Sequence, residues 1–325
     1  MRAVRHETFG DPAEVLSLAE IPDLHPARGQ ILLRVTLSPI HNHDLWTIRG
    51  SYGVRPDLPA TGGSEAVGTV EAVGPDVDPA MVGRRVAVAG LKGSWAEFAL
   101  APAAAAIPVP EGMPDEAAAQ LIAMPFSAIT LLEFLGVKEG DRVIQTAANG
   151  AVGKILSVLA EARGIKVLNL VRRAEAAEEL AAAGNLDTLG TDDPDWLKRA
   201  REIVGPEGAR AAVDSVGGEV AGGLVELLSE DGLLVTFGSM TGEPLQLPTG
   251  PIIFKQLTVK GFWGAKVMPA TPEADRQRMF AELIGLVMDG RLSLTSGGTF
   301  GLDQAAEAVR ASLSPGRSGK IMFRP

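Results

Sequence analysis

The stretch "VIQTAANGAVGKILSVLAEARGIKVLNLVRR", residues 143–173, changes from one kind of pattern to another within a few residues. A short β-branched run leads into a turn of small residues, an apolar helical run follows at once, and a second short apolar run begins after Gly164. This order predicts a strand, a loop, a helix and a second strand. Ala148, Gly150 and Gly153 stand at the glycine positions of the G-x-G-x-x-G pattern, so we expect a βαβ unit that binds a dinucleotide.

The small residues of this loop have a physical purpose. Gly150 lets the backbone approach a pyrophosphate, and Gly153 lets the helix pack closely against the strand. The first N–H groups of the helix, together with its dipole, then attract the anion. A tight turn without a ligand is the alternative interpretation. We predict cofactor binding by five loop residues: Asn149, Gly150, Ala151, Val152 and Gly153.

The end of the second strand indicates which dinucleotide is bound. An NAD-binding unit usually carries Asp or Glu there, about 20 residues after the loop, whereas a nearby Arg accommodates the 2′-phosphate of NADP. This sequence has Arg172 and Arg173 at that point and no acidic residue. Because two cations match the charge of a phosphate, we predict NADP(H), with two solvated surface arginines as the alternative.

Alternation of strand-like and helical runs continues after this unit. Strand-like runs at 209–218, 232–240 and 257–263, with a helical run at 219–232, predict a doubly wound parallel sheet. The acidic run 191–195 predicts a solvated turn. The fold class that we predict is α/β, with this dinucleotide-binding sheet and a second, β-rich domain.

The first third of the chain supplies the β-rich domain. Short β-branched runs at 29–40, 65–74 and 83–90 are separated by Gly and Pro, and Asp115 is expected to cap the helix that follows them. We predict three segments: a β-rich substrate domain over 1–115, an NADP(H)-binding domain over 116–263, and a return to the substrate domain over 264–325. The return contains two helical runs and a final strand at 319–325.

Composition excludes several classes of protein. The 325 residues carry a net charge of −10, which argues against a binder of nucleic acid or of anionic membranes. The sequence has no cysteine, so disulfides, thiolate zinc sites and cysteine nucleophiles are excluded. We find no G-x-S-x-G elbow of a hydrolase.

Two segments indicate whether the protein is secreted or spans a membrane. The first 21 residues have no apolar core and no small-residue cleavage site, so we expect a cytoplasmic protein without a secretory signal. The apolar segment 117–136 is interrupted by Gln120, Pro125 and Glu133, so it predicts a buried helix and no membrane span.

The order of the predicted domains resembles the medium-chain dehydrogenase/reductase superfamily over essentially the whole chain, with the β-rich part as its GroES-like domain. Zinc-using members carry a histidine ligand where "PATGGSEAVGTVEAVGPDV" (59–77) has Ser64, and a cysteine ligand roughly where this chain has His41. Their third ligand lies near Met124 or Pro125. We therefore expect no metal site. His41 and His43 could form a metal pair, but no third ligand is apparent, so surface or satisfied histidines are expected.

Tyr52, the sole tyrosine, lies in the turn-rich segment 49–68. The surrounding sequence resembles the trans-2-enoyl thioester reductases of this superfamily in four stretches: "SPIHNHDLWTIRGSYGVRPDLPATGGSE" (38–65), "VIQTAANGAVG" (143–153), "LVR" (170–172) and "IIFKQLTVKGFWG" (252–264). The resemblance implies a hydride transfer from NADPH to the β-carbon of an enoyl thioester. Tyr52 would hydrogen-bond the thioester oxygen or donate the proton. A packing tyrosine is the alternative.

The resemblance also implies further residues and partners. The expected substrate is a small molecule held as a thioester of coenzyme A or of acyl-carrier protein, and the expected assembly is a homodimer. Three groups of residues follow: Tyr52 and Trp263 for catalysis; Gly238 and Phe262 for the cofactor; Asn42, Phe254, Lys255 and again Trp263 for the substrate.

Two other functions remain open at this point. An NADPH:quinone oxidoreductase of the same superfamily would keep the nucleotide loop without depending on Tyr52. A non-enzymatic NADPH-binding protein on this fold would bind the cofactor and catalyse no reaction.

Overall fold

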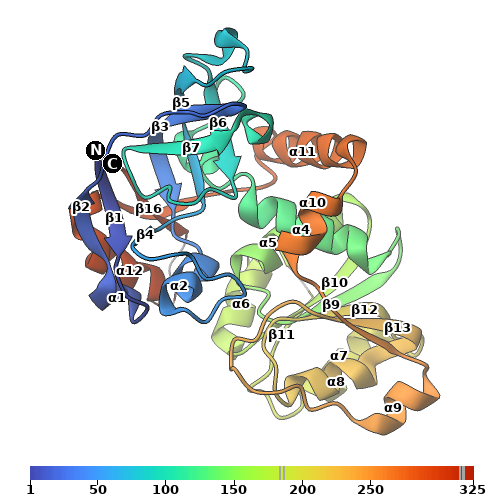
Figure 1. The fold of residues 1–325 in the computed structure, drawn as a ribbon. Coiled ribbons are helices and arrows are strands. Elements are labelled where there is room, and N and C mark those ends of the chain that lie inside the picture. Colours follow the sequence, from blue (N-terminus) through green and yellow to red (C-terminus); the bar gives the residue numbers. More distant parts are fainter. Residues whose placement is uncertain (183, 186, 315, 317–318) are drawn as a thin grey trace. The chain divides into compact units, whose positions relative to one another are not determined.

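The computed structural model describes residues 1–182, 184–185, 187–314, 316 and 319–325 (Figure 1). Its contacts divide the chain into two units. We call residues 1–123 with 283–325 the N-terminal unit, and residues 124–282 the sheet unit. The sequence also predicts a helix over 174–184, and residue 183 of that run lies outside the described residues.

The sheet unit is built on six parallel strands. Their order is β11-β10-β9-β12-β13-β14, and every neighbouring pair is parallel. In chain order this is the 3-2-1-4-5-6 arrangement, whose reversal between β9 and β12 opens a crevice at the carboxyl ends of the strands. The predicted doubly wound sheet is confirmed. The strands are β9 (Arg142–Gln145), β10 (Lys166–Val171), β11 (Thr188–Gly190), β12 (Ala209–Asp214), β13 (Leu228–Thr236) and β14 (Thr258–Gly261).

Helices cover both faces of this sheet. α7 and α8 pack together on one face, and α5 lies on the other (Figure 1), as right-handed crossovers require. Buried leucines and alanines of the strands and of α8 form the core beneath α7 and α8. The helices are α4 (Ala123–Leu135), α5 (Ala151–Ala162), α6 (Ala174–Ala182), α7 (Trp196–Val204), α8 (Val220–Leu227), α9 (Thr249–Phe254), α10 (Gly264–Ala270) and α11 (Glu273–Met288).

Three expectations about elements need correction. The helix expected to run to residue 232 ends at Leu227, because Leu228 already pairs with Ala209 of β12. Helix α7 and strand β11 had not been predicted. Asp115 does not cap the next helix, α3 (Asp115–Ala118), since Pro114 holds that position. Its carboxylate instead accepts a hydrogen bond from Arg85 Nε at 3.0 Å.

The N-terminal unit holds the remaining strands. One sheet has the order β15-β16-β3-β5-β6-β8, with β7 paired to β3, and a smaller one has the order β2-β1-β4. The chain returns to this unit at its end, because β16 pairs antiparallel with β3 through Met322 and Phe323. The strands are β1 (Arg2–His6), β2 (Ser17–Glu20), β3 (Gln30–Pro39), β4 (Ala60–Thr61), β5 (Glu65–Val73), β6 (Arg85–Ala89), β7 (Phe98–Pro102), β8 (Ile107–Pro108), β15 (Ser296–Phe300) and β16 (Lys320–Phe323).

Three further helices belong to the N-terminal unit: α1 (Pro12–Val15), α2 (Asn42–Arg49) and α12 (Ala305–Leu313).

The unit boundaries at 123/124 and 282/283 differ from the expected 115/116 and 263/264. The sheet unit keeps α10 and most of α11, because Phe280 stacks on Phe126 at 4.5 Å and Arg163 Nη2 lies 2.8 Å from Glu282 Oε2.

Among the described residues no helix combines the length and the apolarity that crossing a bilayer requires. The apolar segment 117–136 instead contains the 13-residue α4, nine of whose side chains are buried.

Candidate functional site: a phosphate loop and a histidine cluster

The phosphate loop joins β9 to α5 at the carboxyl edge of the sheet. Ala147 takes a left-handed conformation with φ of 51°. Gly153 touches the strand end so closely that a Cβ there would lie 2.7 Å from the carbonyl oxygen of Ala148, so only glycine fits. The N–H groups of Ala151, Val152 and Gly153 have no partner among the described residues. These free donors at the start of a 12-residue helix fit a pyrophosphate.

A buried polar group beneath the loop holds it in place. The amide nitrogen of Gln145 lies 2.9 Å from the carbonyl oxygen of Gly153 and 2.7 Å from Asn169 Oδ1. Ser157 Oγ donates to the same Asn169 oxygen at 3.0 Å. The network ties the first turn of α5 to β9 and β10. We had not predicted it, although polar residues inside the apolar runs "VIQ" and "LNL" were a signal.

Asp214 orders the neighbouring loop across the crevice. Its buried carboxylate accepts hydrogen bonds from Thr146 Oγ1 at 2.9 Å, Gly217 N at 2.9 Å and Val216 N at 3.1 Å. The two loops at the point where the strand order reverses are thereby joined. This residue was also missed, and an acid that ends the apolar run "AAV" was the available signal.

Arg172 and Arg173 lie directly after β10 and are exposed. Neither guanidinium forms an ion pair with any residue that the structure describes. Asp192 lies beside them, since its Oδ2 accepts the N–H of Ala174 at 3.3 Å and its own N–H donates to the carbonyl of Arg172 at 3.1 Å. Two unpaired cations at this strand end fit a 2′-phosphate.

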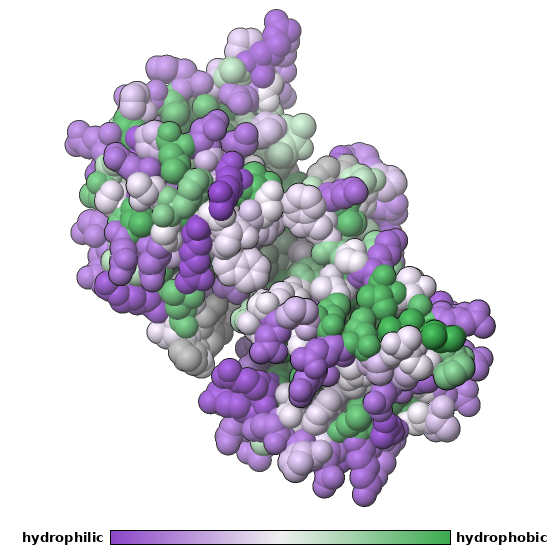
Figure 2. All heavy atoms as spheres, turned by 60° about the horizontal axis from the view of Figure 1, so that its bottom comes forward, coloured by the Kyte–Doolittle hydropathy of each residue, from purple (hydrophilic) through white to green (hydrophobic). Residues whose placement is uncertain are grey.

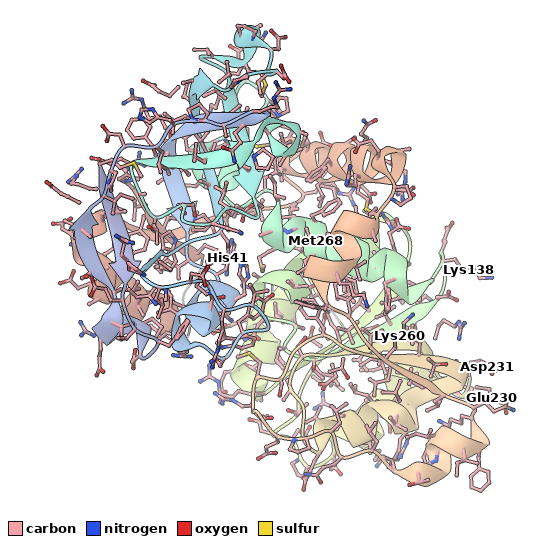
Figure 3. The ribbon with its side chains drawn as sticks, viewed as in Figure 1. His41, Lys138, Glu230, Asp231, Lys260 and Met268 are labelled. Atoms are coloured by element: carbon pink, nitrogen blue, oxygen red, sulfur yellow. The ribbon has the colours of Figure 1, made fainter. Side chains whose placement is uncertain are left out.

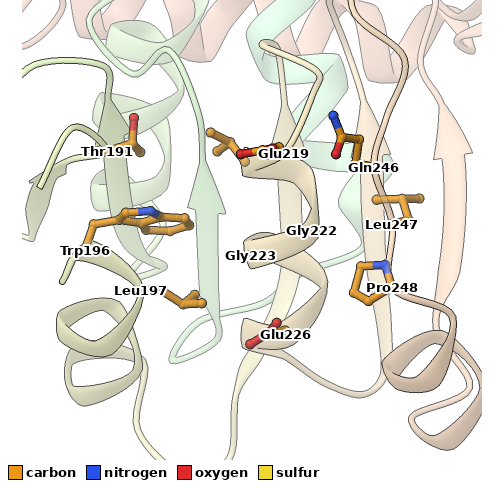
Figure 4. Close-up of a pocket in the computed structure, with 11 residues that line it drawn as sticks. Thr191, Trp196, Leu197, Glu219, Gly222, Gly223, Glu226, Gln246, Leu247 and Pro248 are labelled. Carbon is orange, nitrogen blue, oxygen red and sulfur yellow. The ribbon is translucent and has the colours of Figure 1, made fainter. Parts of the chain in front are cut away.

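A pocket of about 680 Å³ lies along α7 and α8 (Figure 4). Its rim at the carboxyl edge includes Thr191, whose N–H bonds the carbonyl of Val171 at the end of β10. Trp196 forms one wall and lies against Gly223 of α8, where a Cβ would meet the indole at 2.4 Å. The pocket therefore reaches the end of β10, the strand that the arginine pair follows.

Gly238, Phe262 and Trp263 also follow the carboxyl ends of their strands. Gly238 N donates to the carbonyl of Asp214 at 3.3 Å. Phe262 is buried with its ring edge-on to Phe134 at 5.3 Å, so its side chain packs in the unit's interior. Lys260 of β14 (Figure 3) covers the same Phe134 ring at 4.6 Å. Trp263 precedes α10 and is 46% exposed.

Phe254 and Lys255 do not join this group. They precede β14, so the parallel sheet places them at its amino edge, away from the phosphate loop. Lys255 Nζ donates to the carbonyl oxygens of Glu226 and Leu228 at 2.8 Å each and closes the end of α8. We therefore leave both out of the substrate site that the sequence suggested.

In the N-terminal unit, Tyr52 follows α2 by three residues and is half-buried. Its ring lies 6.0 Å from the ring of His43, with 33° between the planes. Its hydroxyl makes no hydrogen bond with the described residues and is not buried. Asn42, the first residue of α2, is exposed. A phenol with a free hydroxyl is available to a ligand in this unit.

His41 and Glu65 form a fully buried pair (Figure 3 labels His41). His41 Nε2 lies 2.8 Å from Glu65 Oε2, and Glu65 Oε1 accepts the N–H groups of Ile122 at 2.7 Å and Ala123 at 2.9 Å. Burial raises the pKa of Glu65 to about 8. Burial, helped by the charge of Lys320, lowers the pKa of His41 well below 6.5. Each group thus favours its neutral form.

His43 is held differently. Its ring stacks on His41 at 5.1 Å, and its Nε2 lies 2.8 Å from Ser64 Oγ. Ser64 in turn donates to Asp44 Oδ1 at 2.6 Å. One nitrogen of each histidine ring is hydrogen-bonded, as expected, whereas the other nitrogen of His41, Nδ1, is buried with no hydrogen-bond partner among the described residues. Within the described part of the chain, no three His, Asp or Glu side chains lie close enough together to hold a metal ion.

Together the fold and the loop define a dinucleotide-dependent enzyme with a separate β-rich domain. Residues 27–111 match the family model of the alcohol dehydrogenase GroES-like domain, and residues 151–284 match that of the zinc-binding dehydrogenases. The chain belongs to the medium-chain dehydrogenase/reductase superfamily and is an oxidoreductase. The alternative of a non-enzymatic binding protein is therefore set aside.

Named relatives fall into two groups. The chain is 33% identical to the mitochondrial enoyl-[acyl-carrier-protein] reductase of Caenorhabditis elegans, covering 96% of this chain and 92% of that one. It is 31% identical to the human enzyme of the same name, covering 98% and 87%. Among solved structures it is similar to the Escherichia coli quinone oxidoreductase complexed with NADPH, at 26% identity and a TM-score of 0.89, and to a mycobacterial quinone oxidoreductase, at 29% and 0.86. Both structural alignments cover 100% of each chain.

Proposed function

We propose that this chain reduces the carbon–carbon double bond of a 2-enoyl thioester and that Tyr52 supplies the hydrogen bond or proton. The cofactor is NADP(H), which provides a hydride from its nicotinamide ring when it is bound. The free N–H groups at the start of α5 would hold its pyrophosphate, and Arg172 and Arg173 would hold its 2′-phosphate.

One observation carries the assignment of substrate class. Tyr52 presents a half-buried ring and an unused hydroxyl, and it does so in a chain that is 33% identical to an enoyl-[acyl-carrier-protein] reductase. When a nucleophile adds to the β-carbon of an enoyl thioester, negative charge develops on the thioester oxygen. A phenol that remains protonated near neutral pH can hydrogen-bond that oxygen or deliver the proton.

A quinone oxidoreductase is the second candidate, because two solved quinone oxidoreductases superimpose with TM-scores of 0.86 and 0.89 over the full chain. A quinone needs a hydride and a proton but has no thioester oxygen to stabilise. A quinone reductase would therefore depend little on Tyr52.

A substrate panel tests the proposal. NADPH oxidation is followed with crotonyl-CoA, longer 2-enoyl-CoAs, an enoyl thioester of acyl-carrier protein, quinones and alcohols, each with and without a zinc chelator. We expect kcat/KM for an enoyl thioester to exceed that for every quinone, with no loss on chelation. Preference for a quinone would replace the proposal with the second candidate, and activity that disappears with the chelator would contradict the expectation of a metal-free site.

We also infer that a second copy of this chain is a partner. Strand β14 ends the six-stranded sheet, so the backbone groups of its outer edge pair with no described strand. Phe254 is 82% exposed, and Ile253 and Val259 are exposed close to it in the sequence. Figure 2 shows hydrophobic side chains gathered on the visible face of the sheet unit. An unpaired sheet edge with exposed apolar residues beside it is suited to pairing with the same edge of another copy.

A further inference from the structure

A chain of three polar side chains in the N-terminal unit has no part in the function proposed above. Asp44 Oδ1, Ser64 Oγ and His43 Nε2 follow one another at 2.6 and 2.8 Å. Asp44 is almost fully buried, and its other oxygen accepts the N–H of His41 at 2.9 Å. The chain is therefore anchored at its inner end and reaches the half-buried ring of His43 at its outer end.

The chemistry of the three groups fixes where their protons lie. An ionised carboxylate can only accept hydrogen bonds, so the Ser64 hydroxyl donates to Asp44. That hydroxyl has no second proton, and it must accept its other hydrogen bond from His43 Nε2–H. Nε2 therefore keeps its proton, and Nδ1 is the nitrogen of His43 that gains and loses one.

His43 Nδ1 is open to a partner. It makes no hydrogen bond within the described residues and is not buried. The ring of Tyr52 lies 6.0 Å away, with its own hydroxyl unused. His41, whose ring stacks on that of His43 at 5.1 Å, is engaged with Glu65 and buried. His43 is thus the imidazole that can exchange a proton with Tyr52, directly or through one water.

We propose that His43 is the proton-relay residue that restores the proton of Tyr52, with Ser64 and Asp44 fixing which nitrogen does so. The proposal rests on the enoyl reductase function. After the β-carbon has received a hydride, the α-carbon takes the proton of the Tyr52 hydroxyl and a phenolate remains. The imidazolium Nδ1–H of His43 gives its proton to the phenolate oxygen. Neutral His43 then regains a proton at Nδ1 from a hydronium ion or a buffer acid of the solvent, so each turnover takes up one proton.

The test replaces His43 with Ala and measures turnover of crotonyl-CoA in H₂O and D₂O. Because proton return would become slow, we expect kcat to fall about 10²-fold, the solvent isotope effect to rise, and KM for NADPH to stay unchanged. Added imidazole should restore part of the rate. Ser64→Ala should lower kcat by a smaller factor. His25→Ala, at an exposed histidine that makes no hydrogen bond with the described residues, is the matched control and should behave as wild type.

Two results would overturn the relay. One is a His43→Ala enzyme with wild-type kcat and isotope effect. The other is a loss of activity with a lower melting temperature, an unchanged isotope effect and no rescue by imidazole, which would mean that His43 only stabilises the fold.

Failure of the relay and failure of the enoyl reductase function can be told apart by nitrogen-15 NMR of the histidine rings in the wild-type protein. Neutral His43 should carry its proton on Nε2. In Ser64→Ala the proton should be found on either ring nitrogen, and both results are expected whichever substrate the enzyme reduces. If the wild-type protein shows this tautomer but does not reduce an enoyl thioester, the proposed function is wrong. The assignment of the His43 proton to Nε2 would still hold. An Nδ1–H tautomer would contradict the relay alone.

Discussion

At the scale of single residues, the choice between NADPH and NADH should depend on Arg172 and Arg173. Both are exposed and without ion pairs at the end of β10. Changing both to Ala removes two charged hydrogen-bond donors, so we expect NADPH binding to weaken by about 2–4 kcal/mol, after a discount for solvent exposure. NADH binding should hardly change. Dissociation constants from cofactor fluorescence titrations measure both effects.

The arginine prediction has a matched control elsewhere in the chain. Arg310 of α12 is also exposed and without an ion pair among the described residues, so Arg310→Ala should leave both dissociation constants unchanged. A wild-type protein that binds NADH more tightly than NADPH would show that the arginine pair has been misinterpreted.

The spacing of residues in the sequence predicted those functional residues whose roles depend on near neighbours in the chain. Gly150 and Gly153 were predicted because their roles depend on a local strand–loop–helix pattern. His43 and Ser64 are 21 residues apart and meet only once the chain has folded, so no spacing rule joins them. Lys255 shows the converse case: it is close to Trp263 in sequence, but strand β14 lies between the two.

At the scale of secondary-structure elements, Glu65 joins β5 to the residues that lead into α4. Its Oε1 accepts two backbone N–H groups there while Oε2 contacts His41. Burial raises the pKa of Glu65 from 4.5 to about 8, so the folded protein keeps a proton that the unfolded chain releases. Its contribution to stability is therefore complete below pH 4.5 and is lost as the pH rises through 8.

Replacing Glu65 with Gln keeps the shape and the acceptor oxygen but removes the titration. Relative to wild type, Glu65→Gln should gain about 2–5 kcal/mol of stability between pH 5 and pH 9, from about 1.4 kcal/mol for each pKa unit. The lowered pKa of His41 makes stability fall as the pH drops below 6.5, in both proteins, so their difference isolates Glu65. Calorimetric melting across this pH range is the measurement.

An exposed carboxylate serves as the comparison for Glu65. Glu111→Gln should give a melting profile parallel to that of wild type, since its side chain makes no hydrogen bond with the described residues. Parallel profiles for Glu65→Gln as well would show that Glu65 is not protonated in the folded protein.

Elements were predicted well where the apolar pattern was strong. Strands β3, β5 and β6 and the β9-α5-β10 unit lie within a few residues of their expected positions. Strand β15 escaped because Gly297 and Gly298 interrupt any alternating pattern, and it exists through parallel pairing with β16. Strand β11 has three residues, too few for a periodicity to show.

At the scale of the whole molecule, we expect two copies to associate through β14. Phe254→Asp places a charge beside that edge, so it should convert a dimer into a monomer in size-exclusion chromatography with light scattering. Leu313→Asp, at an exposed apolar residue of α12, should leave the dimer intact. A monomeric wild-type protein, or a Phe254→Asp protein that remains dimeric, would contradict the inference.

The central claim is that Tyr52 serves the reduction of an enoyl thioester, and the kcat of Tyr52→Phe with crotonyl-CoA tests it most directly. This change removes only the hydroxyl, which makes no hydrogen bond with the described residues, so the melting temperature should stay the same. We predict that kcat falls by about 10²–10³, the usual cost of losing one oxyanion or proton-transfer partner, while KM for NADPH and quinone turnover are unchanged. A kcat within about threefold of wild type would contradict the account.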